Sequence, residues 1–385
     1  MSSMYFMEKL LDGVGVEWKA LGQLATLRRG RVMSKEYLIE NAGEHPVYSS
    51  QTANNGEIGK ITTFDFDGEF IRWTTDGANA GTVFYRNGKF SITNVCGLIK
   101  INIENELNYK FLFYWLTIEA QKHVYSGMGN PKLMSHQVEK IPIPIPCPET
   151  PEKSLEIQGE IVRILDNFTE LTAELTAELT AELTARKKQY NYYRDQFLSF
   201  EAGEVEWKML GEVAEFRRGT AITQKQTTAG DIPVVANGPT PTYLHGESNR
   251  EGETIVIARS GAYAGYVSFW NQPIFLTDAF SVHPDSKILK SKFVYYFLQN
   301  KQEHIHTMKK GAGVPHVRVK EFELYDIPIP SLDEQARIVA ILDKFDAITN
   351  SITEGLPSEI ALRQKQYEYY RDLLFSFPKP EEVGA

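Results

Sequence analysis

The sequence predicts an α+β protein in which two duplicated globular domains are joined and followed by long helices. Three observations predict this fold. The second half of the chain repeats the motifs of the first half, short β-type runs alternate with turns inside each repeat, and each repeat ends in a long stretch with helical apolar spacing. Because the copied helices match in length, we predict an antiparallel coiled coil with internal pseudo-two-fold symmetry.

The repeat is found in order along the whole chain. Val-Glu-Trp-Lys at residues 16–19 returns at 205–208, and the helical motif at 161–166 returns at 338–343. From such matches we predict four segments: a first globular domain at 1–148, a central helix at 149–201, a second globular domain at 202–331 and a C-terminal helix at 332–385.

Short strands and one aromatic helix are predicted inside each globular domain. Residues 70–74 and 254–258 are rich in β-branched and aromatic residues and are bounded by turn residues. The aromatic stretches 111–116 and 293–298 are predicted to be the buried face of a helix. Each domain ends in alternating Ile and Pro, which cannot be helical because proline lacks the backbone donor, so we predict an extended exit.

Each long helix carries an apolar stripe with spacings of three and four residues. In the first helix the stripe comprises Ile161, Ile164, Phe168, Leu171, Leu175, Leu179, Leu183, Tyr190, Tyr193 and Phe197. The second helix repeats this stripe at Ile338, Ile341, Phe345, Ile348, Ile352, Leu356, Ile360, Tyr367, Tyr370 and Leu374. A helix from Ser154 to Phe197 is roughly 66 Å long. We predict a kink or break at Gly355 and Pro357, because an interior proline costs about 3 kcal/mol.

Residues 172–183 are three copies of Thr-Ala-Glu-Leu. Each copy adds about 6 Å of helix and about 40° of rotation. The number of copies is therefore predicted to adjust the distance between the two globular domains. The alternative is neutral drift of a low-complexity helix surface.

Composition excludes several classes of protein. The 385 residues include no apolar run long enough for a membrane span and no signal-peptide pattern, so we expect a cytoplasmic protein. Two cysteines and scattered histidines argue against a disulfide framework and a metal site. The net charge of −9 comes from the helical segments, with 11 acidic against 6 basic residues in 149–201 and 10 against 6 in 332–385. The two globular domains are neutral, so their basic residues can gather on one face and meet a polyanion.

The chain resembles the specificity subunit of type I restriction-modification enzymes over essentially its whole length. The resemblance is carried by Val-Glu-Trp-Lys-x-Leu-Gly, by Ile-Pro-Ile-Pro, and by helices that run from Gln-x-x-Ile-Val-x-Ile-Leu-Asp-x-Phe to Arg-x-Lys-Gln-Tyr-x-Tyr-Tyr-Arg-Asp. The Thr-Ala-Glu-Leu array is similar to that of the variable-spacer branch. The family implies two target-recognition domains that each read half of a bipartite double-stranded DNA site, and helices that dock two methyltransferase subunits. Restriction (motor-nuclease) subunits join that core.

Missing motifs agree with a subunit that has no chemistry of its own. Asn130-Pro131-Lys132 lacks the aromatic residue of an adenine methyltransferase loop, and no Gly-x-x-x-x-Gly-Lys-Ser/Thr loop is present. The resemblance implies that S-adenosylmethionine, ATP and Mg²⁺ belong to partner subunits and that this chain binds no cofactor. Two alternatives are a self-contained DNA methyltransferase or nuclease, and a coiled-coil adaptor that does not bind DNA.

Three sets of residues are candidate DNA contacts, because their chemistry suits phosphates or base edges. The first is predicted to form a basic loop beside a flexible glycine near the start of each domain: Arg28, Arg29, Arg31, Arg217 and Arg218. The second adjoins the Gly-Ala-x-Ala-Gly turns at 77–81 and 261–265: Arg72, Thr74, Thr75, Arg259, Ser260 and Tyr263. The third adjoins the Gly-x-Gly-x-Pro loops at 127–131 and 311–315: Lys132, His136, Lys309, Lys310, His316 and Arg318.

These candidates have alternatives. For the first set, ordinary solvated charge is an equal alternative. The amides of Gln51, Asn54 and Asn55 also have the geometry that recognises adenine, although Asn-Asn-Gly more often forms only a turn.

Overall fold

The computed structural model describes residues 13–102, 105–127, 129–201, 203–311, 313–350 and 355–378. These residues form two compact units. The first unit holds the described residues up to Leu175 and from Leu362 onward, and the second unit holds those of Thr176–Ala361. Each unit combines one globular body with parts of the long helices. This division into two units does not test the four segments predicted from the sequence, so their bounds stay predictions. Residues 1–12 and 379–385 of the outer segments lie outside the described residues.

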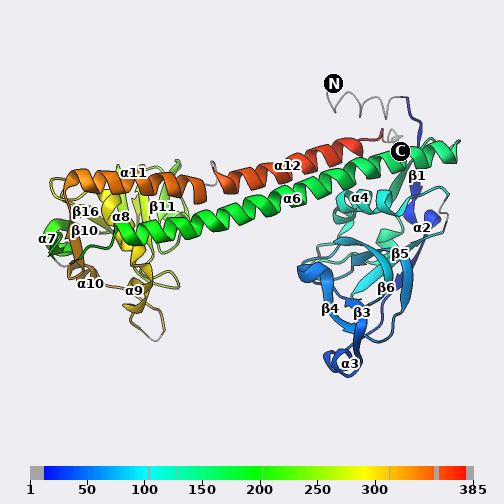
Figure 1. The fold of residues 1–385 in the computed structure, drawn as a ribbon, viewed down its shortest axis with the longest axis horizontal. Helices are drawn as coiled ribbons and strands as arrows, with labels where there is room; N and C mark the ends of the chain where they lie inside the picture. The colour runs from blue at the N-terminus through cyan, green and yellow to red at the C-terminus, as the bar shows by residue number, and fades with distance from the viewer. Residues whose placement is uncertain are drawn as a thin grey trace. The chain divides into compact units, whose positions relative to one another are not determined.

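The globular body of the first unit is an α+β fold (Figure 1). Its elements in chain order are β1 (Val16–Ala20), α2 (Leu21–Leu24), β2 (Ala25–Arg29), α3 (Lys35–Glu40), β3 (Ala42–Tyr48), η1 (Ala53–Gly56), β4 (Glu57–Ile61), β5 (Phe66–Thr74), β6 (Val83–Ile92), β7 (Cys96–Ile101), α4 (Tyr109–Glu119), η2 (Ala120–His123), α5 (Ser135–Val138) and β8 (Pro142–Pro146).

One mixed sheet organises this body. Its strands lie in the order β2-β7-β5-β6-β3-β4, so β5 has a hydrogen-bonded neighbour on each side. Helix α4 buries Phe111 and Leu112 in the same apolar cluster as Ile71 and Trp73 of β5. The predicted strand at 70–74 and the predicted aromatic helix at 111–116 are both confirmed.

The second unit repeats this construction with shorter sheets. Its globular elements are β9 (Glu206–Met209), α7 (Leu210–Val213), β10 (Ala214–Arg218), η3 (Gln224–Gln226), β11 (Ile232–Val235), β12 (Tyr243–His245), β13 (Glu253–Ala258), β14 (Val267–Asn271), β15 (Phe275–Leu276), β16 (Ala279–Pro284), α8 (Ser291–Asn300), α9 (Gln302–Thr307), α10 (Val319–Glu323) and β17 (Asp326–Ile329). The strand orders are β10-β16-β13-β14 and β12-β11-β15. The aromatic side of α8, including Phe293 and Phe297, packs on this sheet.

The two most distinctive sequence motifs of each domain pair with each other. Strand β1, which contains Trp18, runs antiparallel to the Ile-Pro strand β8, with Trp18 opposite Pro144. Strand β9 pairs with β17 in the same way, with Trp207 opposite Pro328. Both are two-stranded sheets, where a proline without a backbone donor is tolerated because it needs to satisfy only one neighbour. The predicted extended exits are therefore confirmed, and each closes its globular body.

Helix α6 (Pro151–Phe197) is continuous over 47 residues, as the apolar spacing predicts. The array leucines Leu175, Leu179 and Leu183 are half-buried, but Leu171 is 61% exposed, so its predicted place in the buried stripe is wrong. Array threonines bond within the helix: Thr180 Oγ1 donates to the carbonyl of Thr176 at 2.7 Å. No helix in the described part of the chain is long and apolar enough to cross a membrane.

The long helices pair antiparallel, and the same contact occurs once in each unit. In the first unit Phe168 of α6 stacks on Tyr370 of α12 (Leu356–Leu374), with ring centroids 5.3 Å apart. In the second unit Tyr193 of α6 stacks on Phe345 of α11 (Leu332–Thr349) at 5.8 Å. In the sequence repeat Phe345 is the counterpart of Phe168 and Tyr370 is that of Tyr193, so the helical repeat is also a repeat of tertiary contacts.

The second helix is broken, as predicted at Gly355 and Pro357. Helix α11 ends at Thr349 and α12 begins at Leu356. Gly355 has a left-handed φ of +84°, which favours glycine, and Pro357 lies in the first turn of α12, where its missing N–H has no helical acceptor to lose. Ile352, part of the predicted stripe, lies outside the described residues.

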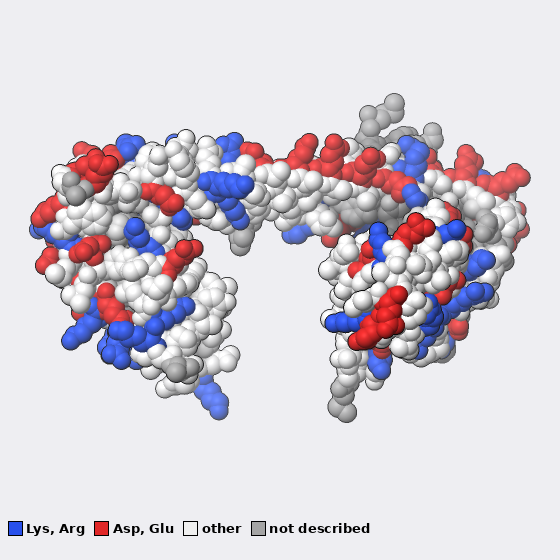
Figure 2. Space-filling view, turned by 60° about the horizontal axis from the view of Figure 1, so that its bottom comes forward, with Lys and Arg blue, Asp and Glu red and all other residues white. Residues whose placement is uncertain are grey.

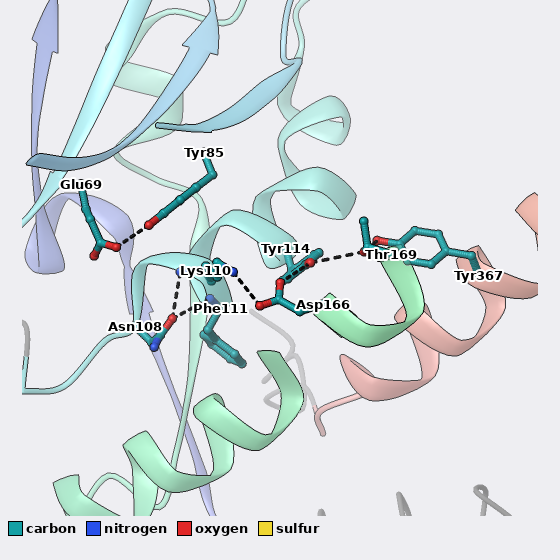
Figure 3. A network of polar contacts seen from close by, with 9 residues as sticks. All are labelled: Glu69, Tyr85, Asn108, Lys110, Phe111, Tyr114, Asp166, Thr169 and Tyr367. Carbon is teal, nitrogen blue, oxygen red and sulfur yellow. Dashed lines mark hydrogen bonds and ion pairs between the residues drawn. The ribbon is translucent and has the colours of Figure 1, made fainter. Parts of the chain in front are cut away.

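A carboxylate on each long helix anchors the globular body beside it. Figure 3 shows that Asp166 of α6 accepts hydrogen bonds from Lys110 Nζ at 2.6 Å and from the Tyr114 hydroxyl at 2.8 Å, both donors belonging to α4. Burial raises the pKa of the Tyr114 hydroxyl, so it stays protonated as a donor. In the second unit Lys292 and Tyr296 of α8 bind Asp343 of α11 at 2.8 and 2.6 Å. Each anchor thus joins the aromatic helix of one domain to a long helix.

Asp166→Asn should lower the free energy of unfolding by about 1 kcal/mol, because it removes the charge from a carboxylate that accepts two hydrogen bonds at a partly exposed site. Chemical denaturation followed by circular dichroism measures the change. Asp195→Asn is the matched control: Asp195 also lies on α6 but is exposed, and among the described residues it pairs only with its neighbour Arg194 at 3.3 Å. Equal losses in the two variants would contradict an anchoring role for Asp166.

Candidate nucleic-acid interface

In the second unit the structure brings the second and third sets of predicted contacts together. The backbone N–H of Gly261 donates to Pro315 O at 2.9 Å, and that of Val317 donates to Arg259 O at 2.9 Å. Ser260 and His316 form a β-bridge between these bonds. The Gly-Ala-x-Ala-Gly turn and the Gly-x-Gly-x-Pro loop, which are well separated in sequence, therefore form one surface feature, which we call the turn–loop frame.

The first unit contains the same frame at the equivalent positions. Gly77 N donates to Pro131 O at 3.0 Å, Leu133 N donates to Thr75 O at 2.9 Å, and Asp76 and Lys132 form the β-bridge. Every one of these residues is the sequence counterpart of a residue with the same place in the second frame. The frame is thus a property of the repeated sequence and not of one domain.

Left-handed glycines shape the turn of each frame. Gly77 and Gly261 have φ of +89° and +82°, a region that strains residues with a Cβ. Gly81 and Gly265 also have positive φ, and a Cβ on them would lie 2.7 Å from Val124 Cγ2 and 2.9 Å from Ile305 Cγ2, respectively. These two constraints explain why the turn keeps its glycines while the residue between its alanines changes.

A cleft of about 850 Å³ opens beside the frame of the second unit. Four predicted contacts line it: Arg218, Arg259, His316 and Arg318. Lys320 also lines the cleft, whereas Asp278 and Glu323 are its described acidic residues, so its charged lining has a positive excess. Figure 2 shows groups of Lys and Arg side chains on the globular bodies and a row of acidic side chains along the helices. A basic hollow of this kind suits a polyanion.

Arg259 is the cleft cation best placed to reach a ligand. Its side chain is exposed, and the nearest carboxylate oxygen, Asp278 Oδ1, is 3.6 Å from Nη1. Asp278 Oδ2 already accepts hydrogen bonds from Ser260 Oγ at 2.8 Å and Asn237 Nδ2 at 2.5 Å. An exposed ion pair of this length contributes little, so the guanidinium remains free to bind another acceptor. Ser260 instead serves the network that holds Asp278.

Other predicted residues of the second unit are more strongly engaged within the protein. Arg217 binds Glu215 in a bidentate pair with distances of 2.8 and 2.6 Å. Lys310 pairs with Glu321 at 2.6 Å, and Lys309 Nζ donates to Ala262 O at 3.3 Å. The remaining member of the second set, Tyr263, is about half exposed in the turn. The Lys-Lys pair is therefore less available than its sequence suggests.

In the first unit the remaining candidates differ in how strongly they are engaged within the protein. Arg28, Lys132 and His136 are exposed. Arg29 lies 3.7 Å from Asp76, and Arg31 binds Asp65 at 3.0 Å. Arg31 is therefore the candidate of this unit that is most strongly engaged within the protein, and the other four are better placed to meet a polyanion.

The prediction that Arg72, Thr74 and Thr75 contact DNA is wrong, because their side chains are buried. Arg72 and Thr74 lie at the end of β5, in the middle of the six-stranded sheet, Thr75 follows directly, and none of the three is more than 1% exposed. Arg72 packs over the ring of Phe84 at 4.0 Å, and burial lowers its pKa. In the register that aligns the two frames, Arg72 corresponds to the buried Val256, and Arg259 corresponds to Thr75, so the two arginines are not equivalents.

The glycine beside each first-set arginine is required by packing and not by flexibility. A Cβ on Gly30 would lie 2.2 Å from Ile92 O, and one on Gly219 would lie 1.9 Å from Thr277 O. Arg28 and Arg29 therefore end the fixed strand β2, and Arg217 and Arg218 end the fixed strand β10, so these four do not belong to a mobile loop. This corrects the interpretation of Arg28 and Arg217 as loop residues.

Three polar residues of this site were missed by the sequence analysis. Asp278 and Asn237 act through contacts with residues distant in the sequence, which no local pattern indicates. Lys320 could have been found from the sequence, because basic residues alternate with valines at His316, Arg318 and Lys320. Among the residues that the structure describes, no cluster of His, Cys, Asp and Glu could hold a metal ion.

Comparison with known proteins gives a consistent match over both units. The family model described as "Type I restriction modification DNA specificity domain" matches residues 14–185 and 203–362. A type I restriction enzyme specificity subunit of Escherichia coli is 39% identical over the whole of both chains. A putative type I specificity subunit of Mycoplasma pneumoniae is 31% identical, covering 94% of this chain and 97% of its own.

Solved structures share the fold at lower identity. The S subunit of a type I restriction-modification system from M. genitalium matches with a TM-score of 0.57 and 20% identity, covering 96% of this chain and 98% of that chain. A chain from a study of assembly and conformational transition of the type I system matches with a TM-score of 0.63 and 16% identity, covering 94% and 97%. Both likenesses concern the fold, because the identities are low.

Proposed function

The chain belongs to the type I restriction-modification DNA specificity family, and we propose from this premise that each of its units reads one half of a bipartite double-stranded DNA target. The observation that carries the proposal is the turn–loop frame. The backbone bonds are the same in both units, but Lys132 and Met134 of the first stand where the second has His316 and Arg318, and the buried Thr75 stands where the second has the exposed Arg259. One frame with different side chains suits two half-sites of different sequence.

Within each half-site, different residues have different tasks. Arg259 reaches beyond its frame and has the fork geometry that binds guanine O6 and N7 in the major groove. Arg28, Arg29, Lys132 and His136 of the first unit, and Arg218, Arg318 and Lys320 of the second, are assigned to phosphates, which fix the register of the protein on DNA. The family is one of DNA-recognition subunits, which disfavours a self-contained methyltransferase or nuclease and an adaptor that does not bind DNA.

The long helices dock two methyltransferase subunits in this proposal. Exposed apolar residues occur on them at equivalent positions: Tyr369 and Leu171 in the first unit, and Tyr192 and Ile348 in the second. Both tyrosines are 58% exposed, and Tyr369 is the counterpart of Tyr192 in the helical repeat. Exposed tyrosines at matched places suit two copies of one partner. Restriction subunits join this assembly, and S-adenosylmethionine, ATP and Mg²⁺ are bound by the partners.

Arg259→Ala should relax the choice of one base pair in the half-site read by the second unit, at a cost of about 1 to 3 kcal/mol, and leave the other half-site unchanged. The measurement is selection of bound fragments from a random DNA pool by the complex with methyltransferase subunits. Lys287→Ala, which removes an exposed charge from the same unit outside the cleft, is the control. Uniform weakening on all sequences would reassign Arg259 to phosphate contact, and an unchanged selection would remove it from the interface.

Tyr192→Ala should release one methyltransferase subunit, and Tyr192→Ala with Tyr369→Ala should release both, because truncating an aromatic anchor at a partner interface often costs about 2 kcal/mol or more. Mass measurement of the complex at nanomolar concentration gives the stoichiometry. Leu324→Ala is the control, since Leu324 is 68% exposed but lies on the globular body. A double variant that still binds two subunits would contradict docking through these tyrosines.

Deleting residues 180–183 should shorten the unspecified gap between the half-sites, most simply by one base pair, and preserve both half-site sequences. The deletion removes one array copy, about 6 Å of helix and about 40° of rotation, against roughly 3.4 Å per base step. Mapping methylated sites genome-wide for parent and deletion, each with the methyltransferase subunit, measures the gap. Full activity with the parental gap would show that the array does not set spacing, and altered half-site bases would show that the helices take part in reading.

A further inference from the structure

Two arginines are buried in the first unit, and no described acidic residue pairs with either of them. Arg72 of β5 has no exposed surface and Arg86 of β6 has 6%, and neither has a carboxylate within ion-pair distance among the described residues. Their guanidinium groups instead lie against two aromatic rings: Arg72 is 4.0 Å from the ring centre of Phe84, and Arg86 is 4.0 Å from that of Tyr48. Arg72 Nε and Nη2 and Arg86 Nε have no hydrogen-bond partner in the part of the chain that the structure describes.

Both arginines hold the same loop by its backbone. Arg72 Nη1 donates to the carbonyl of Ser49, and Arg86 Nη2 donates to the carbonyl of Asn55. The loop, residues 49–56, is closed by a bond from Ser49 N to Gly56 O at 2.9 Å. The backbone of the loop is therefore held near both of its ends by charged donors, which bind carbonyls more strongly than neutral donors do.

The loop is also tied to the turn–loop frame of the first unit. Asn79, the central residue of the Gly-Ala-Asn-Ala-Gly turn, donates through Nδ2 to Ser50 O at 3.2 Å. Loop and frame thus lie side by side on one surface, next to the exposed candidates Arg29 and Lys132.

The outer side of the loop presents side chains to solvent. Gln51, Thr52, Asn54 and Asn55 are all exposed. Asn54 and Asn55 adopt left-handed φ of 50° and 53°, which asparagine tolerates better than most residues. The Gln51 amide donates to Glu57 O at 2.6 Å, and Asn55 Oδ1 accepts from Arg86. Among the described residues, Asn54 is left with both amide atoms free, at the tip of a loop fixed from below.

This construction is costly for a purely structural loop. Burying a cation without an acid is unfavourable, and replacing such groups by apolar ones of similar size often leaves stability unchanged or increases it. Burial, and then the neighbouring Arg72, lower the pKa of Arg86 to about 10, so it remains charged at neutral pH. Costs of this kind are typical of places where function demands a fixed geometry.

We propose that the loop at 49–56 is a base-reading element of the first unit, in which Asn54 recognises adenine and Arg72 and Arg86 are positioning residues beneath it. An exposed asparagine amide can bind adenine N6 and N7 together, donating one hydrogen bond and accepting the other. The inference rests on the proposed DNA-reading function. The second unit has Val256 and Trp270 at the places of Arg72 and Arg86, so the device belongs to one half-site only.

The test compares Asn54→Asp and Asn54→Gly, two changes that tolerate a left-handed φ, in the complex with methyltransferase subunits. Selection from a random DNA pool should show a parental preference for adenine at one position of the first unit's half-site. Asn54→Gly should reduce that preference by about 5- to 150-fold, the range that corresponds to a bidentate contact of about 1–3 kcal/mol. Asn54→Asp should shift it toward cytosine, whose N4 amino group a carboxylate accepts.

Arg86→Met separates positioning from folding. It should lower the adenine preference at the same position while leaving the melting temperature unchanged or raised, because it removes a buried charge but keeps the packing length. Arg86→Lys, which keeps a charged donor, should retain part of the preference. A lower melting temperature with an unaltered base preference would show a merely structural arginine and overturn its positioning role.

The half-site of the second unit is the internal control in all four selections and should not change. If Asn54→Asp and Asn54→Gly both select the parental bases, the loop assignment is overturned while the proposed bipartite reading stands. A parental complex that selects no bipartite sequence at all would instead overturn the proposed function itself. The two failures are therefore distinguishable.

Discussion

One carboxylate in each unit, Asp166 or Asp343, joins a sheet-bearing body to a long helix, and this joint fixes how the body is held on that helix. A helix transmits position only if what it carries cannot rotate freely around it. The lysine and tyrosine that bind each carboxylate come from α4 or α8, whose aromatic faces are buried in the body. A lysine and a tyrosine bind the carboxylate in both units, so each globular body is attached to its long helix by the same set of hydrogen bonds.

The duplicated frame shows how one fold can carry two recognitions. The offset between a motif and its copy decreases along the chain, so the second copy of the repeat has fewer residues than the first. The glycines and the backbone hydrogen bonds of the frame are nevertheless present in both copies. Glycine is retained where a Cβ would strike a carbonyl, as at Gly30 and Gly219, and that constraint does not depend on the target. The other side chains on the frame are not subject to this packing constraint, so they can differ between the units.

Periodic and repeated features were predictable from the sequence, and non-local contacts were not. Helix α6, the strands β5 and β13 and the break near Gly355 follow from spacing and from the backbone chemistry of proline and glycine. Arg72 was misjudged because its burial depends on β6 and β7, which the local sequence does not place beside it. The engagement of Lys310 was not predictable for the same reason, since Glu321 pairs with it across a loop. Asp278 was missed because its partners are distant in sequence.

The exposure of Leu171 follows from the mismatch between the four-residue repeat of the leucines and the 3.6 residues of a helical turn. Four residues advance a helix by about 400°, so leucines repeated every four residues drift by about 40° per copy around its surface. Such a series cannot stay on one contact face, and the structure shows its result: Leu175, Leu179 and Leu183 are half-buried and Leu171 is exposed. Because no array leucine is fully buried, the array contributes little to the core of either unit. The fixed contacts lie outside it, at Phe168 and Tyr193, so helix length can change between them without disturbing a packed core.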